Sequence, residues 1–311
     1  MSGGPRVSII IPTVNREALL CDTLRAVLAQ DYPNREVIVV DQSVRHDAET
    51  VRFLESVNRD IRYHRHAPAN LPAARNVGAR LATGDILVFF DDDLRLPASV
   101  ISAVAGDFAD PSVAGVTGFI ASPHDTGDEK TRAFLRYVDD AATLRRPGLV
   151  EVDHFFGGFM SFRREVVAAV GGFDEWIGTQ PTAAAEDLEF CLRVRQAEFR
   201  LYLDTSLTVV NVGASVAAGG CDKASLPRDV VLASQMRLLL YAYLKNEGRR
   251  PPLGWWHSIA PAYRGFVFNR AVLRGGPRVL WRRHVGFARA LQEASRAVAE
   301  GRQRVVQRWA S

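Results

Sequence analysis

The first 120 residues alternate short apolar runs with longer segments in which apolar residues recur every three or four positions. The apolar runs end at Pro, Gly or Asp, as is typical of strands that are buried on both faces. Helical spacing predicts amphipathic helices between these runs. We expect strands at residues 7–11, 37–40, 61–64, 86–90 and 113–120, and helices at 17–30, 48–57, 72–81 and from Pro97 onward.

After residue 120 the alternation loosens. Residues 122–129 form a polar stretch, 155–162 alternate glycine with bulky side chains, and Gly171 with Gly172 is expected to close a helix in the left-handed conformation. The pattern predicts helices at 134–142, 164–170 and 184–197, short strands at 201–203 and 207–210, and a helical region beyond residue 228.

Strands that alternate with helices predict an α/β fold with a mostly parallel sheet covered on both faces. In such sheets ligands bind beyond the carboxyl ends of the strands. Two of the most apolar runs end in acids at that edge, the first in Asp41 and the second in Asp91, Asp92 and Asp93. This coincidence predicts a functional site there.

Composition and charge narrow the class of protein. Of the 311 residues, 47% are hydrophobic and 24% are charged, which is ordinary for a globular protein. The three cysteines, Cys21, Cys191 and Cys221, have no paired spacing, so a disulfide scaffold and a zinc ribbon are excluded and a reducing compartment is expected. No apolar stretch approaches the ~20 residues of a membrane span. We therefore expect a cytoplasmic location.

The net charge of +4 is unevenly distributed. Residues 228–311 contain 16 Lys and Arg against 4 Asp and Glu, which gives +12 and leaves −8 for the preceding residues. A basic segment suggests an anionic partner, and with its aromatic residues this one suits peripheral contact with an anionic membrane. The alternative is a solvated helical cap. Nucleic acid is not expected, because no recognition module is present.

Three consecutive aspartates after an apolar strand repel one another, and folding does not require them. Closely spaced carboxylates at a strand end can share Mg²⁺ or Mn²⁺, which take oxygen ligands and usually bind together with phosphate. The alternative for Asp91, Asp92 and Asp93 is a solvated turn. Asp41 can accept hydrogen bonds from a nucleoside, or it can simply form a turn.

Other candidates lie near the same predicted edge. Arg75 can pair with a phosphate or hold Asp41, or it can be a surface residue. Glu186 and Asp187 open a helix, where acids are favoured in any case, but a carboxylate there can also deprotonate an acceptor hydroxyl. The pair Gly157 and Gly158 permits close approach of a bound sugar or marks an empty bulge. Hydrolase, P-loop and dinucleotide motifs are missing.

Taken in order, these segments resemble the family 2 glycosyltransferases, which have the GT-A fold and transfer a sugar from a nucleotide-sugar with inversion. The resemblance covers roughly residues 6–213. Its matching stretches are 7–16, 32–33 before 36–41, 74–78, 82–93, 162–167 with 171–174, and 186–193. It implies a GT-A catalytic domain at residues 1–215 and a basic helical C-terminal region at residues 216–311.

The resemblance also implies roles for individual residues. Pro12, Thr13 and Asp41 would line the nucleoside pocket, and Arg75 would help to hold the base or the diphosphate. Asp91 and Asp92 would contact the ribose and the metal shell. Asp93 would ligate the Mn²⁺ or Mg²⁺ directly, with Asp91 beside it. Asp187, next to Glu186, would be the catalytic base, and Gly157 and Gly158 would lie against the donor sugar or the acceptor.

The sequence departs from the family pattern at several positions. Val14 replaces a frequent Tyr, Gln42 replaces an acid, and Asn211 stands where a metal-binding His is common, although its carbonyl oxygen can still serve as a ligand. The segment 303–309 resembles, but does not match, the signature of processive synthases. This mismatch, together with the lack of a membrane-span pattern, favours the transfer of a single sugar.

We therefore expect a bacterial enzyme that uses a UDP- or dTDP-sugar and a hydroxyl on a saccharide, lipid-linked or small-molecule acceptor. Cell-envelope glycan synthesis is the expected setting, with the protein cytoplasmic or peripheral at the inner membrane face. One alternative is a nucleotidyltransferase, but residues 12–15 do not form its phosphate loop. Another is a non-catalytic nucleotide-sugar-binding or scaffold protein of the same fold.

Overall fold

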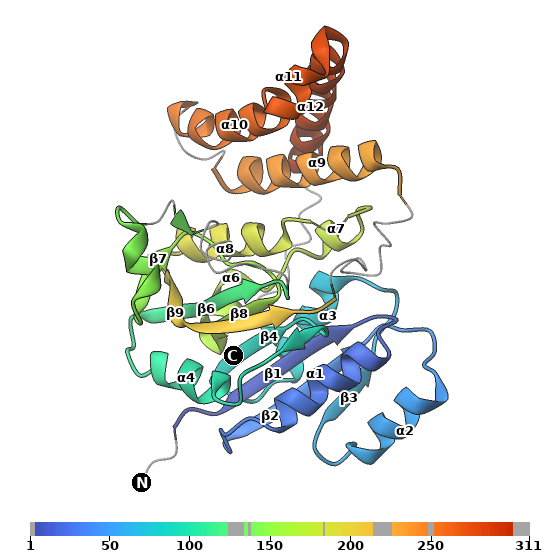
Figure 1. The fold of residues 1–311 in the computed structure, drawn as a ribbon, viewed down its shortest axis with the longest axis vertical. Coiled ribbons are helices and arrows are strands. Elements are labelled where there is room, and N and C mark those ends of the chain that lie inside the picture. The colour runs from blue at the N-terminus through green and yellow to red at the C-terminus, as the bar shows by residue number, and fades with distance from the viewer. Residues whose placement is uncertain are drawn as a thin grey trace.

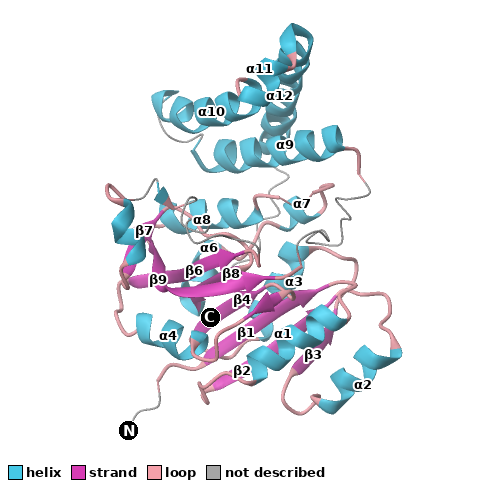
Figure 2. Ribbon diagram, viewed as in Figure 1, coloured by secondary structure: helices cyan, strands magenta, loops and turns pink. Residues whose placement is uncertain are grey.

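In the computed structural model, residues 4–123, 134–135, 138–182, 184–213, 226–247 and 252–300 are described. They form one nine-stranded sheet with helices on both faces, and a further layer of C-terminal helices lies beyond the helices of one face (Figures 1 and 2). The strand order is β3-β2-β1-β4-β8-β6-β9-β5, and β7 also pairs with β9. The strands are β1 (Val7–Thr13), β2 (Arg35–Asp41), β3 (Arg62–Arg65), β4 (Ile86–Phe90), β5 (Leu94–Arg95), β6 (Val113–Ala121), β7 (Leu149–Val152), β8 (Phe159–Arg163) and β9 (Arg200–Asn211).

Most strands run in one direction, so the predicted mixed, mostly parallel sheet is confirmed. β1 pairs in parallel with both β2 and β4, β2 with β3, and β6 with β9. β8 is antiparallel to β4 and to β6, which places these two in the same direction. β5 and β7 run against β9.

Helices cover both faces of the sheet because successive strand residues point to opposite sides. Ile9 and Ile11 pack with the helices on one face, whereas Ile10 packs with those on the other. The first face carries α1 (Ala18–Leu28), α2 (Ala48–Ser56) and α4 (Val100–Asp107), and the second carries α3 (Leu71–Leu81), α6 (Arg164–Val170) and α8 (Glu186–Gln196). The short α7 (Glu175–Gly178) precedes α8.

The C-terminal helices form a separate layer with its own core. These helices are α9 (Arg228–Glu247), α10 (Pro252–Val267), α11 (Arg270–Arg274) and α12 (Gly276–Ala299). Their buried side chains, among them Leu238, Tyr241 and Phe287, cluster together with Ile177 of α7. The layer packs onto the sheet domain through α9, which lies along α8 (Figure 1). No helix in the described ranges is both long and apolar enough to span a bilayer.

Several local predictions were incomplete. The two strands expected at 201–203 and 207–210 are one strand, β9, whose pairing with β6 shifts register between them. The helix expected at 134–142 was wrong for the described part, where a 3₁₀ turn, η2 (Ala141–Arg145), follows instead. β5, β7 and β8 were not predicted. Most of the 122–129 loop, Cys221 and the 303–309 segment lie outside the described residues, and Cys21 and Cys191 are buried free thiols.

Candidate active site

The carboxyl ends of β1, β2 and β4 meet at one edge of the sheet. Pro12 and Thr13 are the last residues of β1 and stand opposite Val40 and Asp41 of β2 in the parallel register. The side chain of Thr13 reaches across to the residues after β4, because its hydroxyl donates a hydrogen bond of 2.6 Å to Asp92 Oδ2. The predicted nucleoside residues and the aspartate turn are therefore neighbours.

The three aspartates after β4 are held by two arginines, Arg75 beside Asp91 and Arg16 beside Asp92 and Asp93. Asp91 Oδ1 lies 3.4 Å from Arg75 Nη2 of α3. Asp92 faces Thr13 and Arg16, whose Nε lies 3.6 Å from Asp92 Oδ1. Asp93 faces Arg16 as well, at 3.4 Å from Nη2. Arg16 was not singled out from the sequence, and only the fold reveals that it neutralises two of these acids.

Asp93 is also held from the end of β9. Asn211 Nδ2 donates to Asp93 Oδ1 at 2.9 Å, and Asn211 Oδ1 accepts the backbone N–H of Gly213 at 3.1 Å. A Cβ at Gly213 would stand only 2.0 Å from Asp93 Oδ2, so this position requires glycine. The predicted proximity of Asn211 and Asp93 is thus seen, with the amide nitrogen rather than the oxygen toward the carboxylate.

Burial makes this acidic turn costly to ionise. It raises the pKa of Asp91 to about 6 and that of Asp92 to about 7, and it also raises the pKa of Asp93. Arg75 and Arg16 act in the opposite direction because their positive charges favour the ionised acids. The turn is therefore a site where additional positive charge is electrostatically favoured.

Arg75 lies at the centre of the site. Its side chain is 1% exposed, and α3 places it between the β4 turn and the start of α8. Nη1 donates to Glu186 Oε1 at 3.1 Å, and Nη2 donates to the carbonyl oxygen of Gly157 at 2.9 Å and faces Asp91. The expectation that Arg75 holds Asp41 was wrong, because its guanidinium is directed to this other set of groups.

Asp187 is held by backbone N–H groups. Its Oδ2 accepts the N–H of Gly157 at 2.8 Å, and its Oδ1 accepts the N–H of Leu188 at 2.7 Å. Ala185 precedes the helix with φ of 67°, a left-handed conformation that is unusual for a residue with a side chain and that turns the chain sharply into α8. Burial and the adjacent Glu186 carboxylate raise the pKa of Asp187 to about 7.

The loop before β8 leaves little room for side chains at its two glycines. A Cβ at Gly157 would lie 3.1 Å from Arg75 Nη2 and 3.2 Å from Glu186 Oε1. A Cβ at Gly158 would lie 3.2 Å from Ile120 Cδ1 and 3.4 Å from Asp91 Oδ2. Close packing therefore explains both glycines, and it brings the backbone of this loop into contact with the acids.

Asp41 is fully buried and its carboxylate is surrounded by donors. Oδ1 accepts the N–H of Ser43 at 2.7 Å, and Oδ2 faces His46 Nε2 at 2.7 Å, the Tyr63 hydroxyl and, at 3.4 Å, Arg65 Nη1. These contacts lower the pKa of Asp41 although burial alone would raise it. Sequence reasoning missed both His46 and Tyr63: Tyr63 approaches through the β2–β3 pairing, and His46 through the path of the loop that follows β2.

The layer of C-terminal helices supports α8 and the segment before it. Lys245 Nζ of α9 lies 2.6 Å from Asp174 Oδ2 and 2.8 Å from Glu189 Oε1, one helical turn after Glu186. Thr182 and Ser234 share a hydrogen bond of 3.0 Å. The helical layer therefore contacts the chain on both sides of Asp187, the candidate base.

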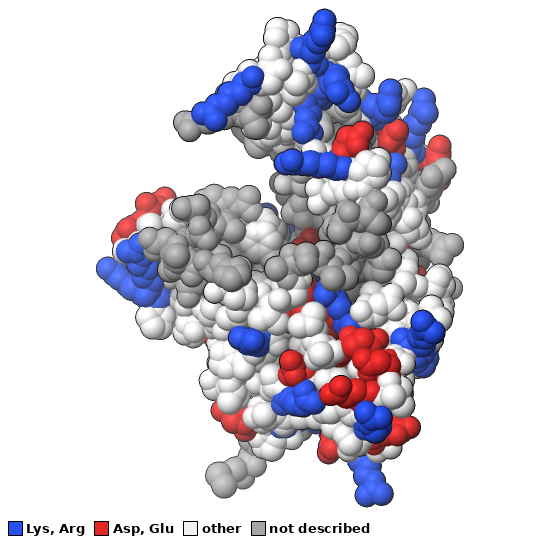
Figure 3. All heavy atoms as spheres, turned by 45° about the vertical axis from the view of Figure 1, so that its right-hand side comes forward, with Lys and Arg blue, Asp and Glu red and all other residues white. Residues whose placement is uncertain are grey.

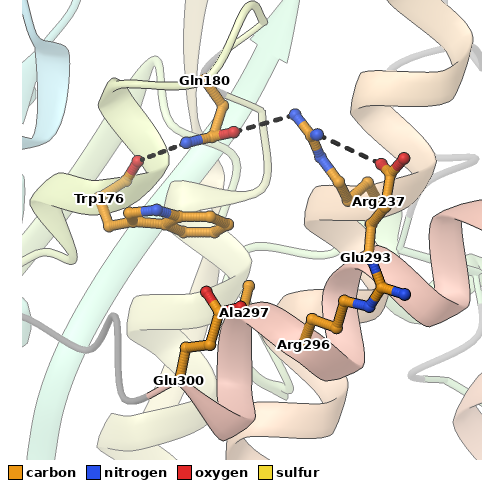
Figure 4. A pocket seen from close by; sticks show the side chains of 7 residues that line it. All are labelled: Trp176, Gln180, Arg237, Glu293, Arg296, Ala297 and Glu300. Carbon is orange, nitrogen blue, oxygen red and sulfur yellow. Dashed lines mark hydrogen bonds and ion pairs between the residues drawn. The ribbon is translucent and has the colours of Figure 1, made fainter.

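A small polar pocket of about 230 Å³ lies at the same junction (Figure 4). Arg237 of α9 donates to Gln180 Oε1 at 2.9 Å and pairs with Glu293 of α12 at 3.3 Å. Figure 4 shows Gln180 between Arg237 and the carbonyl oxygen of Trp176. The polar groups on this side of the pocket are thus bonded to one another. We therefore assign the pocket a structural role.

A comparison with known protein families identifies the family of the chain. Residues 8–171 match the model described as Glycosyl transferase family 2. The chain belongs to this family. Among curated members, the GalNAc(5)-diNAcBac-PP-undecaprenol β-1,3-glucosyltransferase of Campylobacter jejuni is 29% identical over 103 residues, which are 32% of this chain and 33% of that protein. Matches to the first three curated relatives span only 23–34% of their length.

Two solved structures of this family's fold resemble the whole chain. The mannosyltransferase PcManGT of Pyrobaculum calidifontis, solved with GDP-Man and Mn²⁺, aligns over 96% of this chain and 80% of its own, with a TM-score of 0.60 and 20% identity. S. aureus TarS 1–349 with UDP aligns over 95% and 92%, with a TM-score of 0.59 and 15% identity. At these identities the likeness shows the fold, which is GT-A.

Proposed function

We propose that this family 2 member is an inverting glycosyltransferase that moves one sugar from a nucleoside diphosphate donor to a hydroxyl group. The observation that carries the proposal is the chain of contacts along the sheet edge. It runs from Asp41 beside Thr13, through the β4 turn and Arg75, to Asp187 at the start of α8. All the residues that make these contacts lie within residues 1–215, which constitute the proposed catalytic domain. Residues 216–311 form its proposed helical extension.

In the proposed reaction Asp187 is the general base. Each of its carboxylate oxygens accepts one backbone N–H and keeps a lone pair, so it can take the proton of the acceptor hydroxyl. The acceptor oxygen then forms a bond to the anomeric carbon while the bond to the diphosphate oxygen breaks, and the nucleoside diphosphate leaves. Attack opposite to the leaving group inverts the anomeric configuration.

Glu186 and Arg75 hold this arrangement in place. The ion pair between them is buried and ties α3 to the first turn of α8, and the same guanidinium fixes the carbonyl oxygen of Gly157. Gly157 in turn donates to Asp187, so the base is oriented through the loop backbone. We assign Arg75 and Glu186 a positioning role and Asp187 the proton transfer, with Gly157 and Gly158 beside the reacting sugar.

The acidic turn fits a divalent cation in the chemistry of its donors. Carboxylate oxygens are preferred by Mg²⁺ and Mn²⁺, and Mg²⁺ is usually bound by one or two carboxylates together with substrate phosphates. Within the described ranges no three His, Cys, Asp or Glu side chains surround one point, so Asp93 and Asp91 would share the ion with the donor diphosphate. When bound, such a cation neutralises charge on the leaving group.

The donor and the acceptor are proposed from chemistry and from the relatives. PcManGT was solved with GDP-Man, a nucleoside diphosphate sugar, and TarS with UDP, so both ligands contain a nucleoside diphosphate. We propose a UDP- or dTDP-sugar, bound with its base near Pro12, Thr13 and Asp41. The Campylobacter relative takes its name from a lipid-linked acceptor, and we propose a saccharide, lipid-linked or small-molecule hydroxyl in bacterial envelope glycan synthesis.

The test replaces the base without changing its shape. Asp187→Asn is expected to lower transfer by at least about 100-fold, while the affinity for UDP in the presence of Mn²⁺ stays within about twofold. Asp153→Asn is the matched control, because that exposed acid pairs with Arg195 at the surface. Full activity of Asp187→Asn would refute its role as the base. Failure of the wild type to release nucleoside diphosphate with any acceptor would favour the binding-module alternative.

A further inference from the structure

The solvent-facing side of α12 combines arginines with large apolar side chains. Arg278, Arg282, Val285 and Arg289 follow one another at steps of three or four residues, and Trp281 stands beside Arg282, so all five lie on one face of the helix. The opposite face packs into the core of the helical layer through residues such as Phe287 and Ala290. Trp281 is 66% exposed, which is unusual for a side chain of this size. We call these five residues the α12 surface.

Four of the five α12-surface residues line a hollow of about 1010 Å³. Its walls come from α12, the beginning of α9, the end of α10, and α11. Arg228 and Arg283 add positive charge, and Asp229 is the one acid among the lining residues. Its apolar lining consists of Leu232, Phe266, Val272, Val279, Trp281 and Val285. The hollow is therefore amphipathic, with an excess of positive charge.

The arginines of the α12 surface have no acidic partner among the described residues. Within the part of the chain that the structure describes, no ion pair involves Arg278, Arg282 or Arg289. Glu293, the acid nearest along this helix, is paired with Arg237 of α9 instead. Figure 3 shows mainly blue Lys and Arg side chains over the upper part of the helical layer, some red acids along its lower part, and mixed charges over the sheet domain. The surface thus offers unpaired cations beside exposed apolar groups.

We propose that the α12 surface rests on the anionic face of a lipid bilayer. Arginine guanidinium groups pair with lipid phosphates, while Trp is favoured at the headgroup level, where one part of the ring is apolar and the other is wet. Val285 and the apolar lining of the hollow can then lie against the acyl boundary, as in other interfacial helices. This contact requires neither a sugar donor nor an acceptor, and it places the enzyme at a membrane surface.

The experiment measures binding of the full-length protein to vesicles by sedimentation. Vesicles of phosphatidylglycerol mixed with phosphatidylcholine should bind the protein, and vesicles of phosphatidylcholine alone should not. Each arginine near an anionic surface contributes a factor of about five, so Arg282→Gln with Arg289→Gln should weaken binding about 25-fold. Trp281→Ser should weaken binding at both low and high salt, because its contribution is apolar.

The matched control removes two positive charges from the sheet domain instead of from the α12 surface. Arg59→Gln with Arg80→Gln changes two exposed arginines of the sheet domain and should alter vesicle binding by less than about threefold. An equal loss in this control, or equal binding to neutral vesicles, would overturn the proposal. So would the absence of vesicle binding with tight binding to a DNA duplex. Asp187→Asn should bind vesicles as well as the wild type does, and the Arg282 and Arg289 double variant should still transfer sugar to a soluble acceptor. Membrane binding and the proposed transfer reaction are thereby tested separately.

Discussion

Replacing Lys245 by methionine should destabilise the junction between α8 and α9. The Lys245 ammonium lies within 2.8 Å of two carboxylates, and the side chains of Asp174 and Glu189 are only 1% and 0% exposed. Burial alone would raise the pKa of Glu189, yet Arg193 and Lys245 lower it from 4.5 to about 2. This shift corresponds to about 3 kcal/mol of stability at neutral pH.

Lys245→Met removes one of the two cations but leaves both acids buried. Breaking a buried pair in this way typically costs about 3–5 kcal/mol, so we expect the free energy of unfolding to fall by about 3 kcal/mol. Urea unfolding followed by circular dichroism measures this loss directly. Because the folded pKa of Glu189 is lowered, the contribution exists above pH 4.5 and disappears as the pH falls toward 2. The difference between variant and wild type should shrink accordingly.

Arg195→Met is the control, on α8, the helix that carries Glu189. Arg195 lies 2.6 Å from Asp153, as close as the Lys245 pair, but these side chains are 45% and 56% exposed. An exposed pair contributes roughly 0–1 kcal/mol, so this variant should be nearly as stable as the wild type. If Lys245→Met lost no more than this control, burial of the network would not be what makes it stabilising, and the reasoning would fail.

Four further predictions concern the site. Transfer should rise with pH through an inflection near 7, because Asp187 acts only when deprotonated, and a flat rate profile between pH 5 and 9 would argue against it. Gly157→Ala should lower kcat about tenfold with little change in UDP affinity, since its Cβ would press on the Arg75 guanidinium; normal kcat would show that the loop can yield. Asp93→Asn should weaken UDP binding in calorimetry only when Mn²⁺ is present, and an equal loss without the ion would indicate misfolding. Thr13→Val should cost about 1–3 kcal/mol in thermal unfolding by removing the buried hydrogen bond to an aspartate, and an unchanged melting temperature would contradict this.

Much of the sheet and its edge could be predicted from the sequence. The parallel strands are long apolar runs, and their carboxyl ends must lie together, so Asp41 and the three aspartates after β4 were expected near one another. Arg75 was placed on the correct helix. Its partners Glu186 and Gly157 lie far along the chain, and only the packing of α3 against α8 reveals the pairing.

The missed features depend on contacts between distant residues. β5 has two residues and β7 four, so neither can show an alternating pattern, and both exist because β9 offers an unpaired edge. The sequence of β8 is preceded by two glycines, which indicate a loop more strongly than a strand. Arg16 and His46 carry no local signal, because their importance comes from acids on other elements.

The reversed direction of β8 has a consequence for how the reaction centre can change over time. In a wholly parallel sheet, the last residues of the strand at this central position would lie at the ligand-binding edge. Because β8 is antiparallel to β4 and β6, the loop that leads into β8 lies there instead. The groups presented at that point are peptide amide and carbonyl groups, which are the same for any amino acid. The side chains of neighbouring loops can therefore change to accept new sugars, while the backbone hydrogen bond that orients Asp187 is retained.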